Sequence, residues 1–189
     1  MKLSSLRTAL VALVAVAVCA VSIVRAEDEK PAASQPAKVA PVDYKKLKEV
    51  MPAELAGIKR SSNEGQKTAI GDFAMTQATA EYQKAEPGEN DPRITIELTD
   101  YSNATGMAEG MTAWSKLEID KDSDGGFERT TKVKGQPAVE TYQNDGKSGD
   151  LQVWVNGHFL LNVKTTNLSA DEFKKLADSL PIEKITALK

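Results

Sequence analysis

Alternation of apolar and polar residues predicts most of the β-strands in this chain. In residues 93–101, Ile94, Ile96 and Leu98 fall on one face, while the positions between them hold threonine and glutamate. A period of two residues is that of a strand with one buried face. The same pattern, with turn residues between the segments, predicts further strands over 57–62, 73–84, 127–134, 138–143, 151–155 and 158–164.

Two helices are predicted from their caps. Asp43 can cap a helix over residues 44–50, which Pro52 stops. Ser169 and Glu172 form a capping box at the start of a later helix, and Pro181 ends it.

A third helix is predicted over residues 104–119, where four apolar side chains recur at intervals of four, three and three: Met107, Met111, Trp114 and Leu117. We interpret this stripe as the core-facing side of an amphipathic helix, the usual arrangement in a globular domain. The alternative is that the stripe forms a groove for a ligand or a partner. Gly106 and Gly110 weaken the prediction of a helix here.

A hairpin is predicted at Asn156-Gly157, because both residues tolerate positive φ. A two-residue loop would pair Trp154 with Phe159 and place both on one face of the sheet. The opposite face of this hairpin is also apolar. A hairpin that is apolar on both faces is usually central in a sheet covered on both sides. The alternative is that one face is covered and the other is a binding surface, with Trp154 and Phe159 as the ligand-binding residues.

The predicted elements alternate irregularly between helices and strands, with short links between most strands. This order indicates an α+β fold, with a mainly antiparallel sheet of about six or seven strands and helices packed on one or both faces. We assign residues 43–189 to a single domain. Residues 27–42 are rich in proline and alanine and are interpreted as a flexible tether.

The first 26 residues have the features of an export signal. Lys2 and Arg7 precede an apolar run over residues 8–24, and Val24-Arg25-Ala26 suits cleavage after Ala26. We therefore expect a periplasmic or secreted protein without a transmembrane segment after cleavage. The alternatives are a retained membrane anchor and a lipoprotein signal processed at Cys19.

Charge and cysteine content narrow the function. Cleavage after Ala26 leaves 21 basic and 27 acidic residues, a net charge of −6, and no cysteine. Interspersed acidic charge argues against nucleic acid as a partner. The lack of cysteine in the mature chain excludes disulfides, cysteine nucleophiles and zinc–thiolate sites.

One segment resembles the first half of a calcium-binding loop. Asp120, Asp122 and Asp124 alternate before Gly125, and Glu128 stands at the ninth position of such a loop. The twelfth position holds Thr131 in place of the usual glutamate. A solvated acidic turn is the favoured interpretation, and calcium at these four carboxylates is the alternative.

Residues 151–185 contain the Asn-Gly hairpin followed by NLSADEFKKLADSLPIEKI. This segment resembles the C-terminal unit of many exported bacterial domains of unknown function. The order of elements resembles that of the Mog1/PsbP-like α/β/α sandwiches. The resemblance implies a layered fold and no particular functional residue.

The function expected from the sequence is that of an exported, non-enzymatic module that binds a protein partner or a small apolar ligand in the cell envelope or outside the cell. The single histidine, His158, has no recognisable catalytic partner. The alternatives are a calcium-binding envelope protein, a hydrolase that uses carboxylates alone and a purely structural envelope protein. No cofactor other than calcium is expected.

Overall fold

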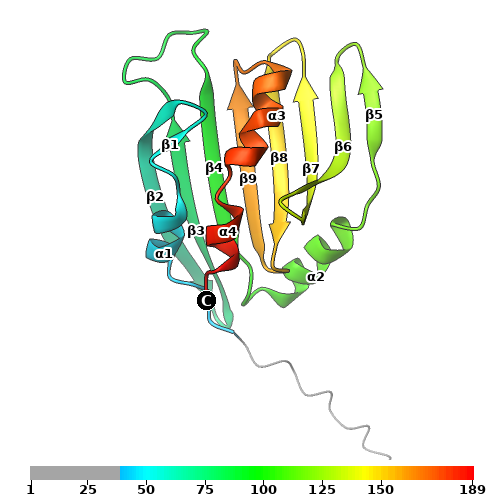
Figure 1. Ribbon diagram of the computed structural model, residues 1–189. Coiled ribbons are helices and arrows are strands. Elements are labelled where there is room, and N and C mark those ends of the chain that lie inside the picture. The colour runs from blue at the N-terminus through cyan, green and yellow to red at the C-terminus, as the bar shows by residue number, and fades with distance from the viewer. Residues whose placement is uncertain (1–38) are drawn as a thin grey trace, which may run out of the picture. The chain divides into compact units, whose positions relative to one another are not determined.

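A nine-stranded sheet forms the centre of the domain (Figure 1). The computed structural model describes residues 39–189. Every neighbouring pair of strands is antiparallel. From edge to edge the strands are β1 (Glu54–Leu55), β2 (Ile58–Ile70), β3 (Phe73–Tyr82), β4 (Arg93–Asp100), β9 (Phe159–Thr166), β8 (Ser148–Val155), β7 (Gln136–Gln143), β6 (Gly126–Val133) and β5 (Asp120–Ser123).

This architecture confirms the α+β class with a mainly antiparallel sheet, but the strand number of six or seven was too low. The sequence pattern missed β1, which has only two residues, and β5, whose four side chains are all exposed. It also ended β2 too early. Most side chains of β2 are polar and no side chain of the strand is buried, so its second half shows no apolar alternation.

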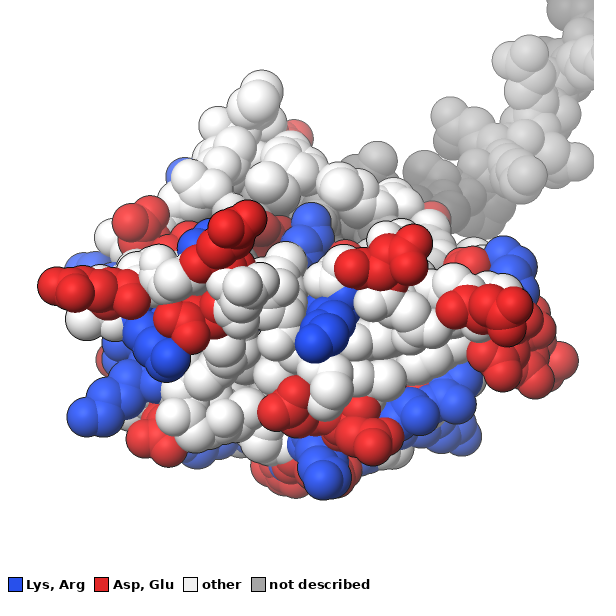
Figure 2. Space-filling model, turned by 90° about the horizontal axis from the view of Figure 1, so that it is seen from above, with Lys and Arg blue, Asp and Glu red and all other residues white. Residues whose placement is uncertain are grey.

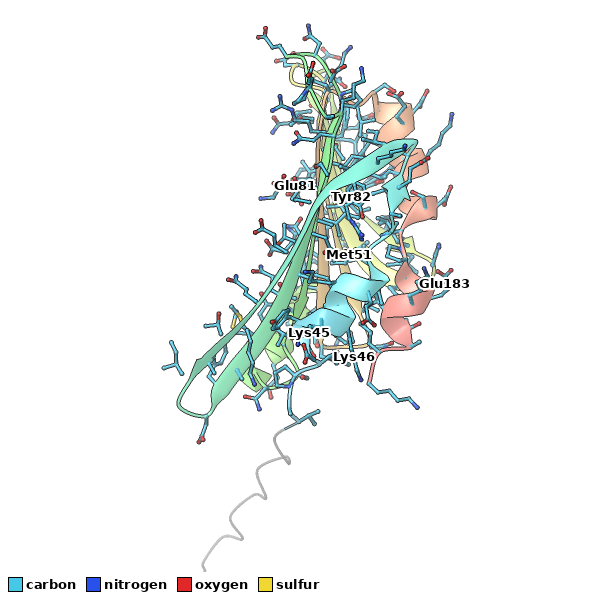
Figure 3. All side chains as sticks on the ribbon, turned by 90° about the vertical axis from the view of Figure 1, so that its left-hand side faces the viewer. Lys45, Lys46, Met51, Glu81, Tyr82 and Glu183 are labelled. Atoms are coloured by element: carbon cyan, nitrogen blue, oxygen red, sulfur yellow. The ribbon has the colours of Figure 1, made fainter. Side chains whose placement is uncertain are left out.

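Three helices lie against one face of the sheet (Figures 1 and 3). They are α1 (Tyr44–Val50), α3 (Ala170–Ser179) and α4 (Ile182–Thr186). Their buried side chains form one apolar cluster with the inward side chains of β3, β4, β8 and β9. The capping box predicted for α3 is present, with Ser169 and Glu172 bonded reciprocally. Helix α4 was not predicted.

The opposite face of the sheet is polar. Neighbouring residues Glu81 and Tyr82 show the alternation, with Tyr82 toward the helices and Glu81 on the other side (Figure 3). A row of directly paired positions crosses this second face through Thr79, Glu97 and Asn162, all of them half-buried. One face of this antiparallel sheet therefore holds the core, and the other is solvated.

The chain enters the domain at a fixed point. The backbone N–H of Val42 donates to Asp100 Oδ2 at 2.7 Å, and its carbonyl accepts from Thr76 Oγ1 at 2.7 Å. Val39 is also attached, because its carbonyl accepts from Asn103 Nδ2 at 3.2 Å. Val39 and Val42, which the sequence assigns to the tether, therefore contact the domain. The export signal and residues 27–38 of the predicted tether lie outside the described residues.

Between residues 39 and 189, the structure has no helix both long enough and apolar enough to cross a membrane.

Candidate functional site

Helix α2 (Thr105–Trp114) connects β4, at the centre of the sheet, to β5, at its edge. It lies at the end of the sheet where the described chain begins, away from α3 (Figure 1). The predicted stripe falls on this helix and the turn after it. We call this set of side chains the α2 surface: Met107, Met111, Trp114 and Leu117.

The α2 surface is not part of the core, so the core-facing interpretation was wrong. Met107 is 49% exposed and Leu117 is 51% exposed. Met111 and Trp114 are half-buried, and neither belongs to the buried apolar cluster. The pattern identified an amphipathic helix correctly, but spacing alone does not reveal what covers the apolar side.

Local interactions hold α2 weakly. Ala104 stands at its N-cap and offers no side-chain hydrogen bond. Gly106 and Gly110 lie inside the helix, and a Cβ added at either would meet nothing within 4 Å. Each glycine costs about 0.5–1 kcal/mol of helix stability relative to alanine. A weakly formed helix that exposes methionine can adjust its shape to a bound surface.

Asn103 joins the start of α2 to two segments that each carry an exposed apolar side chain. Asn103, just before the helix, accepts from the Ala74 N–H at 2.9 Å and donates to the Val39 carbonyl at 3.2 Å. Val39 is 61% exposed, and Ile70, at the tip of the β2–β3 hairpin, is 75% exposed. Among the described residues, Val39, Ile70, Met107 and Leu117 are the exposed large apolar side chains.

The exposure of Ile70 was not predicted, although the sequence carries a signal for it. Ile70 pairs with Phe73 across a two-residue loop that begins with Gly71 at φ 57°. Gly71-Asp72 is a hairpin dipeptide of the kind that favours such a loop. A tight turn between two apolar residues predicts exposure of those residues at the hairpin tip.

The two predicted ligand-binding residues do not share a face. The loop between β8 and β9 has three residues, because Val155 pairs with Phe159 and Trp154 pairs with Leu160. This register differs by one residue from the predicted one and moves Phe159 to the helix side of the sheet. Phe159 is fully buried there, while Trp154 is 3% exposed and lies on the polar face.

Trp154 is enclosed by its own neighbours. Its ring centre lies 6.4 Å from that of Tyr101, which follows β4. Burial, and secondarily the charge of Glu97, raises the pKa of Tyr101. Trp154 Nε1 has no hydrogen-bond partner within the described part of the chain. The aromatic pair supports the loop ahead of α2 and offers no open surface to a ligand.

The four predicted calcium ligands are not brought together. Residues 120–123 form β5, and Lys121 pairs directly with Glu128 of β6. Glu128 therefore lies on one face, where it forms an ion pair with Lys121 Nζ at 2.8 Å. Asp120 and Asp122 lie on the other. Across residues 39–189 no cluster of three acidic, histidine or cysteine side chains could hold a metal ion.

The buried carboxylates serve structural contacts. Asp100 is fully buried and accepts from the backbone N–H groups of Val42 and Ser102. Glu140 is buried and paired with Arg129. His158 is half-buried, and its Nδ1 lies 3.0 Å from the Asn156 carbonyl oxygen. None of these groups faces another in the way that acid–base hydrolysis requires.

The end of the domain away from α2 has a different character. Seen from above, it carries basic and acidic side chains intermixed, with no large field of one sign (Figure 2). Such a surface is typical of a solvated face and does not favour a polyanion. The α2 surface differs from this end in exposing the large apolar side chains of Met107 and Leu117.

Comparison of the chain with protein-family models, with curated proteins and with solved structures found no match. The resemblance to Mog1/PsbP-like domains stays a prediction.

Proposed function

We propose that the protein is an exported, non-catalytic module that binds a protein partner through the α2 surface. The observation that carries the proposal is the exposure of Met107 on α2 and of Leu117 in the turn after it, both outside the core. Contiguous apolar side chains left open to water are typical of interaction sites. Export is inferred from residues 1–26 of the sequence.

The exposure of the α2 surface favours a protein as its binding partner over a small apolar ligand. A drug-sized ligand usually has most of its surface enclosed by its pocket. Met107 and Leu117 are each about half exposed, and the helix that carries the stripe stands at the end of the sheet (Figure 1). An exposed amphipathic helix fits instead into an apolar groove of another protein, with its anchors at intervals of three and four residues.

The charged residues of α2 favour a protein as the binding partner over a lipid bilayer. Helices that lie in the interface of a membrane usually carry lysine and arginine on their polar face. The α2 helix has neither, and its only charged residue is Glu109. The partner we propose is a protein whose groove is apolar at its floor and tolerates one carboxylate at its rim.

Site-specific photo-crosslinking in the native host tests this function. A photoreactive amino acid at position 107 should give a discrete adduct with another protein, and the same residue at Ala113 should not. Ala113 is exposed on the same helix, away from the stripe. With the partner purified, Met107→Glu with Leu117→Glu should weaken binding at least tenfold, whereas Ala113→Glu should leave it unchanged.

Three results would overturn the proposal. Adducts with lipid alone would identify a membrane surface as the occupant, and adducts with a second copy of this chain would identify a homodimer. Equal crosslinking at positions 107 and 113 would remove the claim that the stripe is the binding surface. Circular dichroism of each variant shows whether the fold is retained.

A further inference from the structure

A separate cleft lies at the other end of the sheet. It is formed by the β1–β2 turn and the start of β2 (residues 57–61), the beginning of the β3–β4 loop (residues 83–85), and Pro92. Its volume is about 700 Å³, within the range of small-molecule sites. Figure 1 shows the β3–β4 loop projecting past the ends of β1 and β2 at this place. The cleft shares no residue with the α2 surface.

The ionisable residues that line the cleft are all basic. Three of its lining residues are basic, Lys59, Arg60 and Lys84, and none is acidic. The mature chain as a whole is acidic, so three basic residues around one cleft depart from the average of the molecule, although Lys59 also stands opposite Glu54 of β1. Ile58, Ala85 and Pro92 give the same cleft an apolar part.

The three cations differ in how they are held. Arg60 Nη1 donates to the Met51 carbonyl at 2.8 Å, which fixes that side chain to the end of α1. Lys59 is exposed. Lys84 forms an ion pair with Asp91 at 2.6 Å, and its side chain is 63% exposed. Exposed ion pairs add little net stability, so another anion can compete for Lys84 at little cost.

Asp91 is positioned by the loop as well as by Lys84. Its second carboxylate oxygen accepts from the Gly88 N–H at 2.8 Å. The hydrogen bond from Lys84 holds the pKa of Asp91 below its usual range. Asp91 therefore stays ionised near neutral pH and occupies Lys84 when the cleft is empty.

We propose that this cleft binds a small organic carboxylate with an apolar body. The carboxylate would bridge Lys59 and Lys84 and displace Asp91 from Lys84. The apolar body would lie against Ala85 and Pro92. This inference goes beyond the proposed function and does not depend on it.

Decanoate is the probe, with decanol as the neutral ligand of the same chain length. Titration of the ¹⁵N-labelled mature protein should give saturable amide shifts at residues 57–61 and 83–92 with decanoate. Decanol should bind at least tenfold more weakly. Shifts centred on residues 105–117, no saturation at submicellar decanoate, or equal binding of decanol would overturn the proposal.

Matched double variants test the cations. Lys59→Met with Lys84→Met should weaken decanoate binding at least tenfold. Lys132→Met with Lys164→Met removes the same charge from exposed positions on β6 and β9 and should change binding less than twofold. Equal losses in the two double variants would show a general charge effect and would reject the site.

A third variant is expected to strengthen decanoate binding. Asp91→Asn removes the competing carboxylate and keeps an acceptor for the Gly88 N–H, so decanoate should bind several times more tightly. Unchanged or weaker binding in this variant would contradict the displacement of Asp91. The amide spectrum shows in the same experiment that each variant is folded.

Discussion

Gly149→Ala should destabilise the domain by overfilling the contact between β8 and α3. A Cβ built on Gly149 would lie 2.4 Å from Phe173 Cε2 and 2.5 Å from Cδ2. Carbon atoms in favourable contact lie about 3.5–4.0 Å apart, so the ring or the helix must move by about 1 Å. Phe173 is 1% exposed, and its ring centre lies 5.7 Å from that of Tyr142. The ring has no open side to move into.

The expected size follows from overpacking in well-filled cores, which costs about 1–3 kcal/mol. Because Phe173 is enclosed, we expect about 2–3 kcal/mol of lost unfolding free energy. A loss of that size lowers the melting temperature of a domain of this length by about 5–10 °C.

Urea denaturation measures the effect, with the midpoint lowered and the slope m unchanged. Gly110→Ala is the control. Its Cβ would meet nothing within 4 Å, so the same change in α2 should stabilise by up to about 1 kcal/mol. Phe173→Leu should relieve the clash with the Cβ that Gly149→Ala introduces. The double variant should therefore lose less unfolding free energy than the sum of the two single losses. A Gly149→Ala protein within about 0.5 kcal/mol of the parent would refute the reasoning, since that is the range of neutral surface changes.

Three further predictions address pH, metal and export. Burial raises the pKa of Tyr82 from 10.0 to about 12. The free energy of unfolding should therefore keep its full value below pH 10 and fall by up to about 2–3 kcal/mol as the pH rises to 12. Urea midpoints across that range should fall less steeply for Tyr82→Phe. Millimolar calcium should shift the melting temperature by less than about 1 °C relative to chelator, because Glu128 lies on the opposite face of the β5–β6 hairpin from Asp120 and Asp122. A larger shift, lost in Asp120→Ala with Asp122→Ala, would restore the calcium hypothesis. Intact mass of the exported protein should correspond to residues 27–189, and a chain that keeps Met1 would contradict cleavage after Ala26.

The sequence predicted those elements whose signals are local. The strand at 93–101 was recognised because Ile94, Ile96 and Leu98 alternate with polar residues, and burial on one face produces that pattern. The start of α3 was recognised because Ser169 and Glu172 satisfy each other's backbone within one turn. Neither inference required knowledge of distant parts of the chain.

The candidate site depended on information that is not local. Asn156-Gly157 is compatible with loops of two or three residues, and the choice of one register over the other decides whether Trp154 and Phe159 share a face. The stripe on α2 has the same spacing whether it meets the core or water. Only the tertiary arrangement, in which α1, α3 and α4 already fill one face, leaves α2 outside.

The attachment of Val42 gives the domain a definite mechanical behaviour. A pulling force applied to the chain ahead of Val39 would first load the single bond from Asn103, and then the two bonds at Val42. Those two bonds end on β3 and β4, which are inner strands of the sheet, so the load enters away from either edge. Strands at an edge are paired on one side only and can be peeled off singly, whereas β3 and β4 are each paired on both sides. The domain should therefore withstand tension from its N-terminal side as a unit.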